Sequence, residues 1–185
     1  MSESLSTRRE AMLAGVLAAA VAGGARAAPA AVTGHEHDWD FMVGDWRVHH
    51  RQLQGRLVGS TKWIEFGGSL RFWVTMGGLG NVDDNVIEKP GGTYRAMTVR
   101  GFDPKAGLWR IWWLDGRFPT TLDPPMLGGF KDGGGLFLGD DTLDGKPIKV
   151  RFLWTTGAEP TWEQAFSPDG GRTWETNWRM RCTRA

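Results

Sequence analysis

Apolar and polar side chains alternate along two segments of the chain. From position 148 to 154, apolar residues occupy every second position, with lysine or arginine between some of them. Near the C-terminus, a second alternating set is formed by Trp174, Thr176, Trp178, Met180 and Cys182. A period of two is typical of a β-strand with one dry and one wet face. The two segments therefore predict antiparallel strands around a closed core.

Short turn signals divide the rest of the chain. Asp-Gly, which tolerates the positive φ angles of tight hairpins, begins at positions 115, 132, 144 and 169. The 27 glycines and nine prolines interrupt the sequence too often for long helices. Strand-like runs lie at 45–53, 57–66, 69–75, 85–88, 93–102, 108–115, 127–131, 135–139, 148–155, 161–167 and 174–183. They predict an all-β fold, an up-and-down antiparallel β-barrel of about eight to ten strands.

The first 27 residues have the features of a signal peptide. Arg8 and Arg9 precede a weakly apolar run that is too short to span a bilayer, and Ala25-Arg26-Ala27 is a small-residue cleavage site. The paired arginines favour the twin-arginine route. We expect a signal peptide at 1–27, a flexible lead-in at 28–36 and one barrel domain at 37–185. The cleaved protein is expected in the periplasm or outside the cell, without stable membrane insertion.

The charge balance argues against nucleic acid as a partner. Removal of 1–27 takes away three arginines and two glutamates, which leaves equal numbers of basic and acidic residues. Phosphate contacts need a basic face, which a neutral chain does not predict. The lone Cys182 cannot form an internal disulfide. The oligomeric state stays open.

Gly44-Asp45-Trp46 resembles the G-x-W motif that opens the first strand of calycin barrels. Longer stretches at 44–50, 111–117, 141–145 and 162–166 resemble an uncharacterised bacterial family of calycin-like barrels, of the lipocalin and nitrobindin kind. The resemblance covers essentially the whole chain after residue 27. It implies that Trp46 plugs the closed end of the barrel and that Arg179 or Arg181 packs across it. It implies no activity.

The resemblance also bears on cofactors. Haem-binding barrels of the nitrobindin type use a histidine from the C-terminal part of the barrel. The four histidines here are His35, His37, His49 and His50, so the resemblance implies no haem. His35 and His37 find no third ligand nearby in the sequence, so we expect no metal site and no cofactor.

Residues 167–174 match the Asp-box pattern S-x-D-G-G-x-T-W of sialidase-type propellers. A propeller needs several such blades, and this chain carries one copy. We interpret the segment as a structural hairpin turn, closed by Asp169 and Gly170, with Trp174 packed beneath it.

His50 is the main candidate for chemistry. It shares a strand face with Trp46, and four residues of strand place it about 13 Å above that ring. An imidazole inside a tryptophan-lined barrel is suited to act as an acid, a base or a ligand-orienting group. The alternative is a histidine satisfied by a neighbouring carboxylate or backbone group.

Other candidate ligand-binding residues follow from the same alternation. Trp113 and Asp115 share a face, and Asp115 and Arg117 flank Gly116 before a proline-containing loop. These two charges either contact a ligand or form an ion pair that fixes the loop. Gln164, between aromatic residues, and Trp178, in the last strand, are also expected to face inward.

Three functions remain open from the sequence. The first is a binding protein that holds a small apolar or planar molecule in a tryptophan-lined cavity. The second is an isomerase, cyclase or lyase in which His50 moves a proton while Asp115 or Arg117 stabilises charge. The third is a solid-core barrel that acts in protein interaction or assembly.

Overall fold

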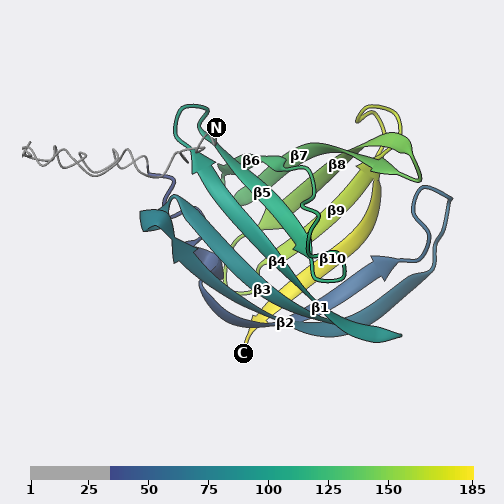
Figure 1. Cartoon of the computed structure of the whole chain (residues 1–185), viewed down its shortest axis with the longest axis horizontal. Helices are drawn as coiled ribbons and strands as arrows, with labels where there is room; N and C mark the ends of the chain where they lie inside the picture. Colours follow the sequence, from purple (N-terminus) through teal and green to yellow (C-terminus); the bar gives the residue numbers. More distant parts are fainter. Residues whose placement is uncertain (1–33) are drawn as a thin grey trace, which may run out of the picture. The chain divides into compact units, whose positions relative to one another are not determined.

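Ten β-strands follow one another around a closed barrel in the computed structural model, which describes residues 34–185 (Figure 1). Each strand is antiparallel to its neighbours, and β1 pairs with β10 to close the sheet. The predicted all-β up-and-down barrel is therefore confirmed. The signal segment at 1–27 and most of the lead-in at 28–36 lie outside the described residues. The strands are β1 Gly44–Leu53, β2 Trp63–Thr75, β3 Gly80–Lys89, β4 Gly92–Asp103, β5 Leu108–Asp115, β6 Met126–Lys131, β7 Gly134–Leu143, β8 Lys146–Thr155, β9 Thr161–Ser167 and β10 Glu175–Arg184.

The two ends of the barrel differ in their connections. We call the end where β1 begins the closed end and the end where β1 finishes the mouth. The short 3-10 helices η1 Asp40–Met42 and η2 Met76–Gly78 lie in the connections of the closed end. The mouth, at the right of Figure 1, carries the loops 54–62, 90–91, 116–125, 144–145 and 168–174. Within residues 34–185, no helix has the length and apolar character needed to cross a membrane.

The closed end is packed with aromatic rings. Trp39, Trp46 and Trp109 are each 1 % exposed, and Phe72 and Phe137 are as deeply buried. The ring of Trp39 lies 6.2 Å from that of Trp109 in an edge-on arrangement and 5.9 Å from that of Phe137. Such contacts add to the large apolar area that each ring buries. This layer is the main hydrophobic core.

The ring of Trp46 lies under an arginine, but not under either of the two expected from the sequence. The indole Nε1 of Trp46 donates a hydrogen bond to the Met42 carbonyl at 2.7 Å. The arginine over its ring is Arg184, with 3.8 Å from Cζ to the ring centroid, so the expectation of Arg179 or Arg181 was wrong. Trp46 pairs in register with Arg184, whereas Arg179 and Arg181 bind Glu163 and Glu159 on the outer face. The last strand runs one residue further than its apolar pattern indicated.

The alternation predicted for β10 breaks at one point. A β-bulge lies between Thr176 and Trp178, and the residue inside it, Asn177, is fully buried. Side chains before the bulge are therefore out of phase with those after it. Thr176 donates to Glu163, and Trp174 lies under the guanidinium of Arg151, so these two do not share the inner face of Trp178.

β2 and β3 are longer than the sequence pattern indicated, and so is β7, which continues beyond the expected end at 139 to Leu143. The runs 57–66 and 69–75 are not separate strands, because β2 continues through Gly67 and Gly68. A Cβ at Gly68 would lie 2.5 Å from the carbonyl oxygen of Val86 in β3 and 2.9 Å from Nε2 of His50 in β1, so the glycine makes room for both neighbouring strands. β3 begins at Gly80 rather than at residue 85, because its inward positions carry polar side chains that hide the alternation.

Candidate functional site: the internal cavity

A cavity of about 320 Å³ lies inside the barrel above the aromatic layer. Leu70 and Arg100 line its lower part, and the exposed residues Asp123 and Asp141 line its upper part. The cavity therefore opens to solvent at the mouth. All ten strands are paired around the cavity, so a small molecule would enter through the mouth and not between two strands.

The wall of the cavity is largely aromatic. Trp162 packs edge-on against both Phe152, at 4.9 Å between ring centroids, and Trp178, at 5.9 Å. Phe166 and Trp113 add further rings from β9 and β5. Flat ring faces offer dispersion contact and a quadrupole to any planar molecule between them. The arrangement is suited to an apolar or planar ligand.

His50 lies within this wall and is 2 % exposed. Its ring stacks on Phe66 at 4.9 Å, and its Nδ1 accepts a hydrogen bond from the indole Nε1 of Trp178 at 3.2 Å. Its partner is thus an aromatic N–H, neither the carboxylate nor the backbone group considered from sequence. The two side chains also line the cavity together.

The environment of His50 keeps its ring neutral. Burial, with a smaller contribution from His49, lowers the pKa of His50 to about 4. Since Nδ1 accepts from Trp178, the proton of the neutral ring is on Nε2. At neutral pH, His50 is therefore a hydrogen-bond donor through Nε2 and carries no charge.

Gln164 contributes a second polar group to the wall. Its Nε2 donates to Oδ1 of Asn177 at 2.8 Å, so the side chain that the β10 bulge buries fixes the amide of Gln164. Both residues come from strands on the His50 side of the barrel, since β1, β10 and β9 are consecutive in the sheet. The hydrogen-bonding groups are therefore concentrated on one wall.

Asp115 and Arg117 form an ion pair at the mouth. The guanidinium donates from Nε at 3.0 Å and from Nη2 at 2.6 Å to the two carboxylate oxygens, and the Arg117 amide also donates to Asp115. These hydrogen bonds lower the pKa of Asp115. The guanidinium lies 4.0 Å from the ring centroid of Tyr94. The pair fixes the start of loop 116–125 and also lines the cavity, so both roles considered from sequence stay open.

A buried polar group forms the floor of the cavity, and sequence reasoning missed it. Nη2 of Arg100 lies 2.6 Å from Oδ2 of Asp83, with side chains 4 % and 1 % exposed. Arg100 also donates to Oδ1 of Asn81 at 3.1 Å, and Asn85 donates to Asp83. The guanidinium lies 4.5 Å from the Trp39 ring centroid, so it connects the floor to the closed-end core.

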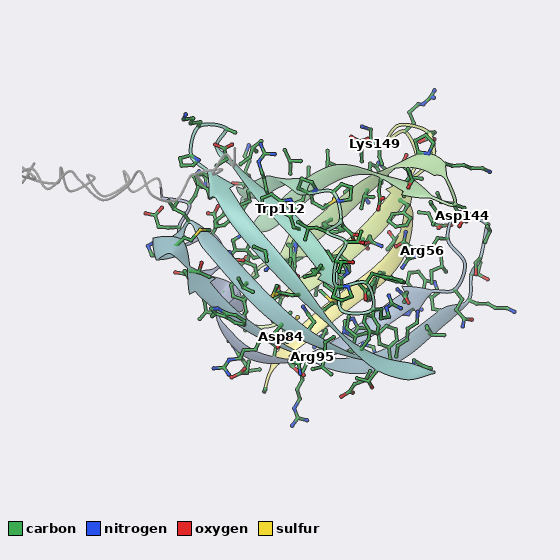
Figure 2. All side chains as sticks on the ribbon, in the orientation of Figure 1. Arg56, Asp84, Arg95, Trp112, Asp144 and Lys149 are labelled. Carbon is green, nitrogen blue, oxygen red and sulfur yellow. The ribbon has the colours of Figure 1, made fainter. Side chains whose placement is uncertain are left out.

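Two further cations lie at the mouth. Arg56, in loop 54–62, and Lys89, the last residue of β3, both line the cavity and are half-buried. The guanidinium of Arg56 lies 5.3 Å from the Phe166 ring centroid in β9. Burial, followed by the charges of Arg56 and Arg117, lowers the pKa of Lys89. Figure 2 labels Arg56 at the mouth end of the barrel.

Acidic residues gather on another part of the rim. Asp123 is in loop 116–125, whose backbone bonds to β5 through the Asp123 amide and the Trp113 carbonyl at 3.1 Å. Burial, followed by the charges of Asp141 and Asp115, raises the pKa of Asp123. The rim thus has a cationic part and an acidic part.

The Asp-box segment forms a hydrogen-bonded turn. The carboxylate of Asp169 accepts from Ser167 Oγ at 2.7 Å, from the Thr173 hydroxyl at 2.6 Å and from the amides of Arg172 and Thr173. These donors lower the pKa of Asp169 well below its usual range. Gly170 has a φ of +75°, which favours glycine.

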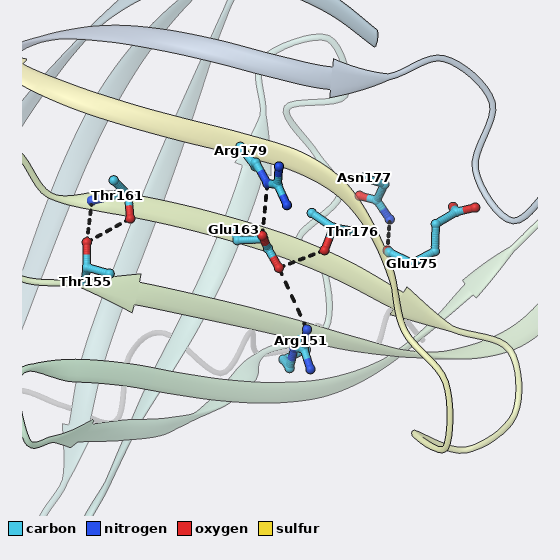
Figure 3. Close-up of polar contacts among 8 residues, drawn as sticks. All are labelled: Arg151, Thr155, Thr161, Glu163, Glu175, Thr176, Asn177 and Arg179. Carbon is cyan, nitrogen blue, oxygen red and sulfur yellow. Dashed lines mark hydrogen bonds and ion pairs between the residues drawn. The ribbon is translucent and has the colours of Figure 1, made fainter. Parts of the chain in front are cut away.

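The outer face of β8, β9 and β10 carries a separate polar network (Figure 3). Glu163 accepts from Thr176 at 2.8 Å and from Arg179 at 3.0 Å, and Arg151 lies 3.8 Å away. These side chains lie on the opposite face of the sheet from Gln164. The network stabilises the wall from outside and is not part of the cavity.

The residues predicted from the sequence fall into two groups, those that line the cavity and those at the ends of the barrel. The ligand-binding candidates His50, Trp113, Asp115, Gln164 and Trp178 all line the cavity, as does Arg117. Gly44 and Trp46 are at the closed end, and Asp169, Gly170 and Trp174 are in the mouth turn. Their roles in binding or catalysis stay predictions. Four charged residues that line the cavity were not predicted from the sequence: Asp83, Arg100, Arg56 and Lys89. The mostly polar segment 81–85 could have indicated the pair formed by Asp83 and Arg100.

Within residues 34–185, no group of three or more His, Cys, Asp or Glu side chains is arranged to hold a metal ion. Comparison with protein-family models gives no match, and comparison with curated protein sequences gives none either. The fold and cavity define the class of protein, an antiparallel ten-stranded barrel with an aromatic interior, consistent with a calycin-like barrel.

Proposed function

We propose that the barrel binds a small apolar or planar molecule in its internal cavity. The observation that carries the proposal is the cavity of about 320 Å³ with aromatic walls. Small-molecule sites generally have volumes of about 300 to 1,000 Å³ and a few polar groups among apolar ones. His50 and Gln164, each fixed by a neighbouring side chain, are the groups that would orient the ligand.

The cavity separates this proposal from the solid-core alternative. A barrel that served only as an assembly module would need no internal space, because side chains fill the interior of small barrels. Here the tightly packed aromatic layer is confined to the closed end, and the cavity above it opens at the mouth. The volume therefore favours a ligand over a purely structural interior.

The state of His50 favours binding over catalysis. A general base works best when its pKa is near the operating pH, and the pKa of His50 is about 4. The neutral ring is suited to donate a hydrogen bond from Nε2. An isomerase, cyclase or lyase remains the second candidate, because Asp115 and Arg117 are within the same cavity.

Native mass spectrometry of the protein from its own host tests the proposal directly. A binder should carry a stoichiometric small molecule, which Val150→Phe should remove because Val150 lines the cavity. Val99→Phe is the matched control: its neighbours Thr98 and Arg100 point inward, so Val99 points outward. Met180→Phe, a smaller increase in volume at another lining position, serves if the first variant fails to fold.

Two results would contradict binding as the function. Retention of the molecule in a folded Val150→Phe variant would place it outside the cavity. Chemical conversion of the bound molecule by the wild type, abolished in His50→Gln with retention of binding, would establish an enzyme instead.

We also propose that residues 1–27 direct export by the twin-arginine route. The motif Arg8-Arg9 and the short apolar run support this proposal. Replacement of both arginines by lysine should retain the protein in the cytoplasm with an intact N-terminus. Export of that variant in an uncut form would contradict the proposal.

A further inference from the structure

The cations of the cavity differ in whether the protein supplies their counter-ions. Arg100 is paired with Asp83, and Arg117 is paired with Asp115. No ion pair among residues 34–185 includes Arg56 or Lys89. Both are half-buried and line the same cavity. Two cations are therefore held at its entrance without a carboxylate of their own.

Arg56 extends across the mouth from loop 54–62. Its guanidinium packs against Phe166 of β9, and the Leu57 amide next to it donates to Oε1 of Glu175 at 2.6 Å. Its charge nevertheless acts on Lys89 of β3, on the other side of β1 and β2. Tyr94 and Glu175 are the acidic groups whose charges act on Arg56; only Glu175 is a carboxylate, and the Leu57 amide occupies one of its oxygens.

The cations at the mouth repel one another. Repulsion from Arg56 and Arg117 adds to burial in lowering the pKa of Lys89. An anion between the cations would replace that repulsion by attraction, in a site where partial burial strengthens the interaction. The acids Asp123 and Asp141 lie on another part of the rim and do not pair with either cation.

We propose that the ligand is an amphipathic anion, with a carboxylate-like group bound between Arg56 and Lys89 and an aromatic part against the tryptophan wall. This inference rests on the proposed function and adds the chemical class of the ligand. The half-buried cations give the anionic end its position at the mouth. Trp113, Trp178 and Phe166 give the apolar end its surface below.

Competition against a fluorescent probe tests the inference on the full chain. The probe is 1-anilinonaphthalene-8-sulfonate, and the competitors are 2-naphthoate, the neutral 2-naphthamide and the cationic 2-naphthylmethylammonium. We expect naphthoate to bind at least about ten times more tightly than the amide, since an ion pair worth about 1.4 kcal/mol is a factor of ten. The ammonium compound should bind most weakly.

Lys89→Met should remove most of the preference for naphthoate and change the affinity for naphthamide less than about twofold. Arg56→Met should do the same while keeping an apolar stem against Phe166. Lys146→Met is the matched control, because Lys146 is also at the mouth end, at the start of β8, but does not line the cavity. It should leave both affinities unchanged.

The outcomes distinguish this inference from the proposed function. Equal affinities for naphthoate and naphthamide in the wild type would overturn the anionic ligand and leave the binding barrel standing. Tighter binding of the ammonium compound would also overturn it and would assign the ligand charge to the acidic part of the rim. Binding of neither the probe nor any competitor, with a folded barrel by circular dichroism, would overturn the proposed function and this inference together.

Discussion

The two ends of the barrel are built from the same strands but carry different side chains at their inward positions. At the closed end, inward positions carry large rings that are buried to 1 % exposure or less, such as Trp109 of β5 and Phe137 of β7. At the mouth, inward positions carry charged groups such as Lys89 and Asp115 that remain half-buried. The closed end therefore supplies stability, and the mouth holds charges that stay partly exposed to solvent. Between them, Arg100 and Asp83 form a polar boundary.

The largest effect that separates the two ends is the loss of a closed-end tryptophan. Trp46→Ala should lower the free energy of unfolding by about 4 kcal/mol, because it removes a fully buried ring together with its hydrogen bond to Met42. Trp113→Ala, which shortens a half-buried ring near the mouth, should lower it by about 1 to 2 kcal/mol. Urea unfolding followed by circular dichroism measures both. Equal losses would contradict the division between an end that stabilises the fold and an end that we propose binds a ligand.

The boundary between the ends should be the next most sensitive feature. Arg100→Met leaves the carboxylate of Asp83 buried without its cation, and such a change lowers stability by about 3 to 4 kcal/mol. The double variant Arg100→Met/Asp83→Leu should recover most of the loss, because no charge is then buried. A double variant less stable than the single one would contradict this explanation of the cost. The same urea experiment applies.

His50 should give the barrel a pH dependence that neither end provides alone. Its pKa is about 6.5 in the unfolded chain and about 4 in the barrel, so the unfolded state binds the proton more readily between these values. Stability is complete above pH 6.5 and should fall by about 3 kcal/mol as the pH decreases to 4. His50→Gln should remove this part of the pH dependence. An unchanged difference between pH 7 and pH 4 would contradict it.

The pH experiment has an internal reference in the mouth turn. Hydrogen bonds to Asp169 lower its pKa, so the stability it provides is lost only at lower pH than that of His50. The variant Asp169→Asn should therefore leave the window between pH 7 and 4 almost unchanged. A loss in that window that persists in Asp169→Asn and disappears in His50→Gln is assigned to His50.

The sequence predicted the barrel because most strands obey a period of two. Ile148, Val150 and Trp154 alternate as written, and each is buried. The strand bounds failed where another element decided the residue type. Position 68 has room only for glycine because the Val86 carbonyl of β3 and the His50 ring of β1 occupy the space beside it, which no local pattern reveals.

The candidate site was only partly predictable for a similar reason. Alternation along the strands correctly placed four cavity residues, because each lies an even number of positions from an inward-facing ring. These residues are His50, Trp113, Gln164 and Trp178. Asp83 and Arg100 are 17 residues apart in the sequence. They become neighbours only through the register of β3 with β4, which the local pattern does not give. Arg56 lies in a loop, where alternation carries no information about direction.

The smallest prediction separates backbone effects from side-chain packing. Gly133 at the closed end has a φ of +78°, Gly170 at the mouth has a φ of +75°, and an added Cβ would meet no atom closer than 3.6 Å at either. Alanine at either position should therefore lower stability by a similar amount, about 1 kcal/mol, through the left-handed conformation alone. Thermal unfolding of the two variants, compared side by side, measures the difference. Since the two glycines have similar φ angles and free space, equal losses would leave side-chain packing as the source of the contrast between the ends. A much larger loss for Gly170→Ala would show that the mouth turn itself stabilises the barrel.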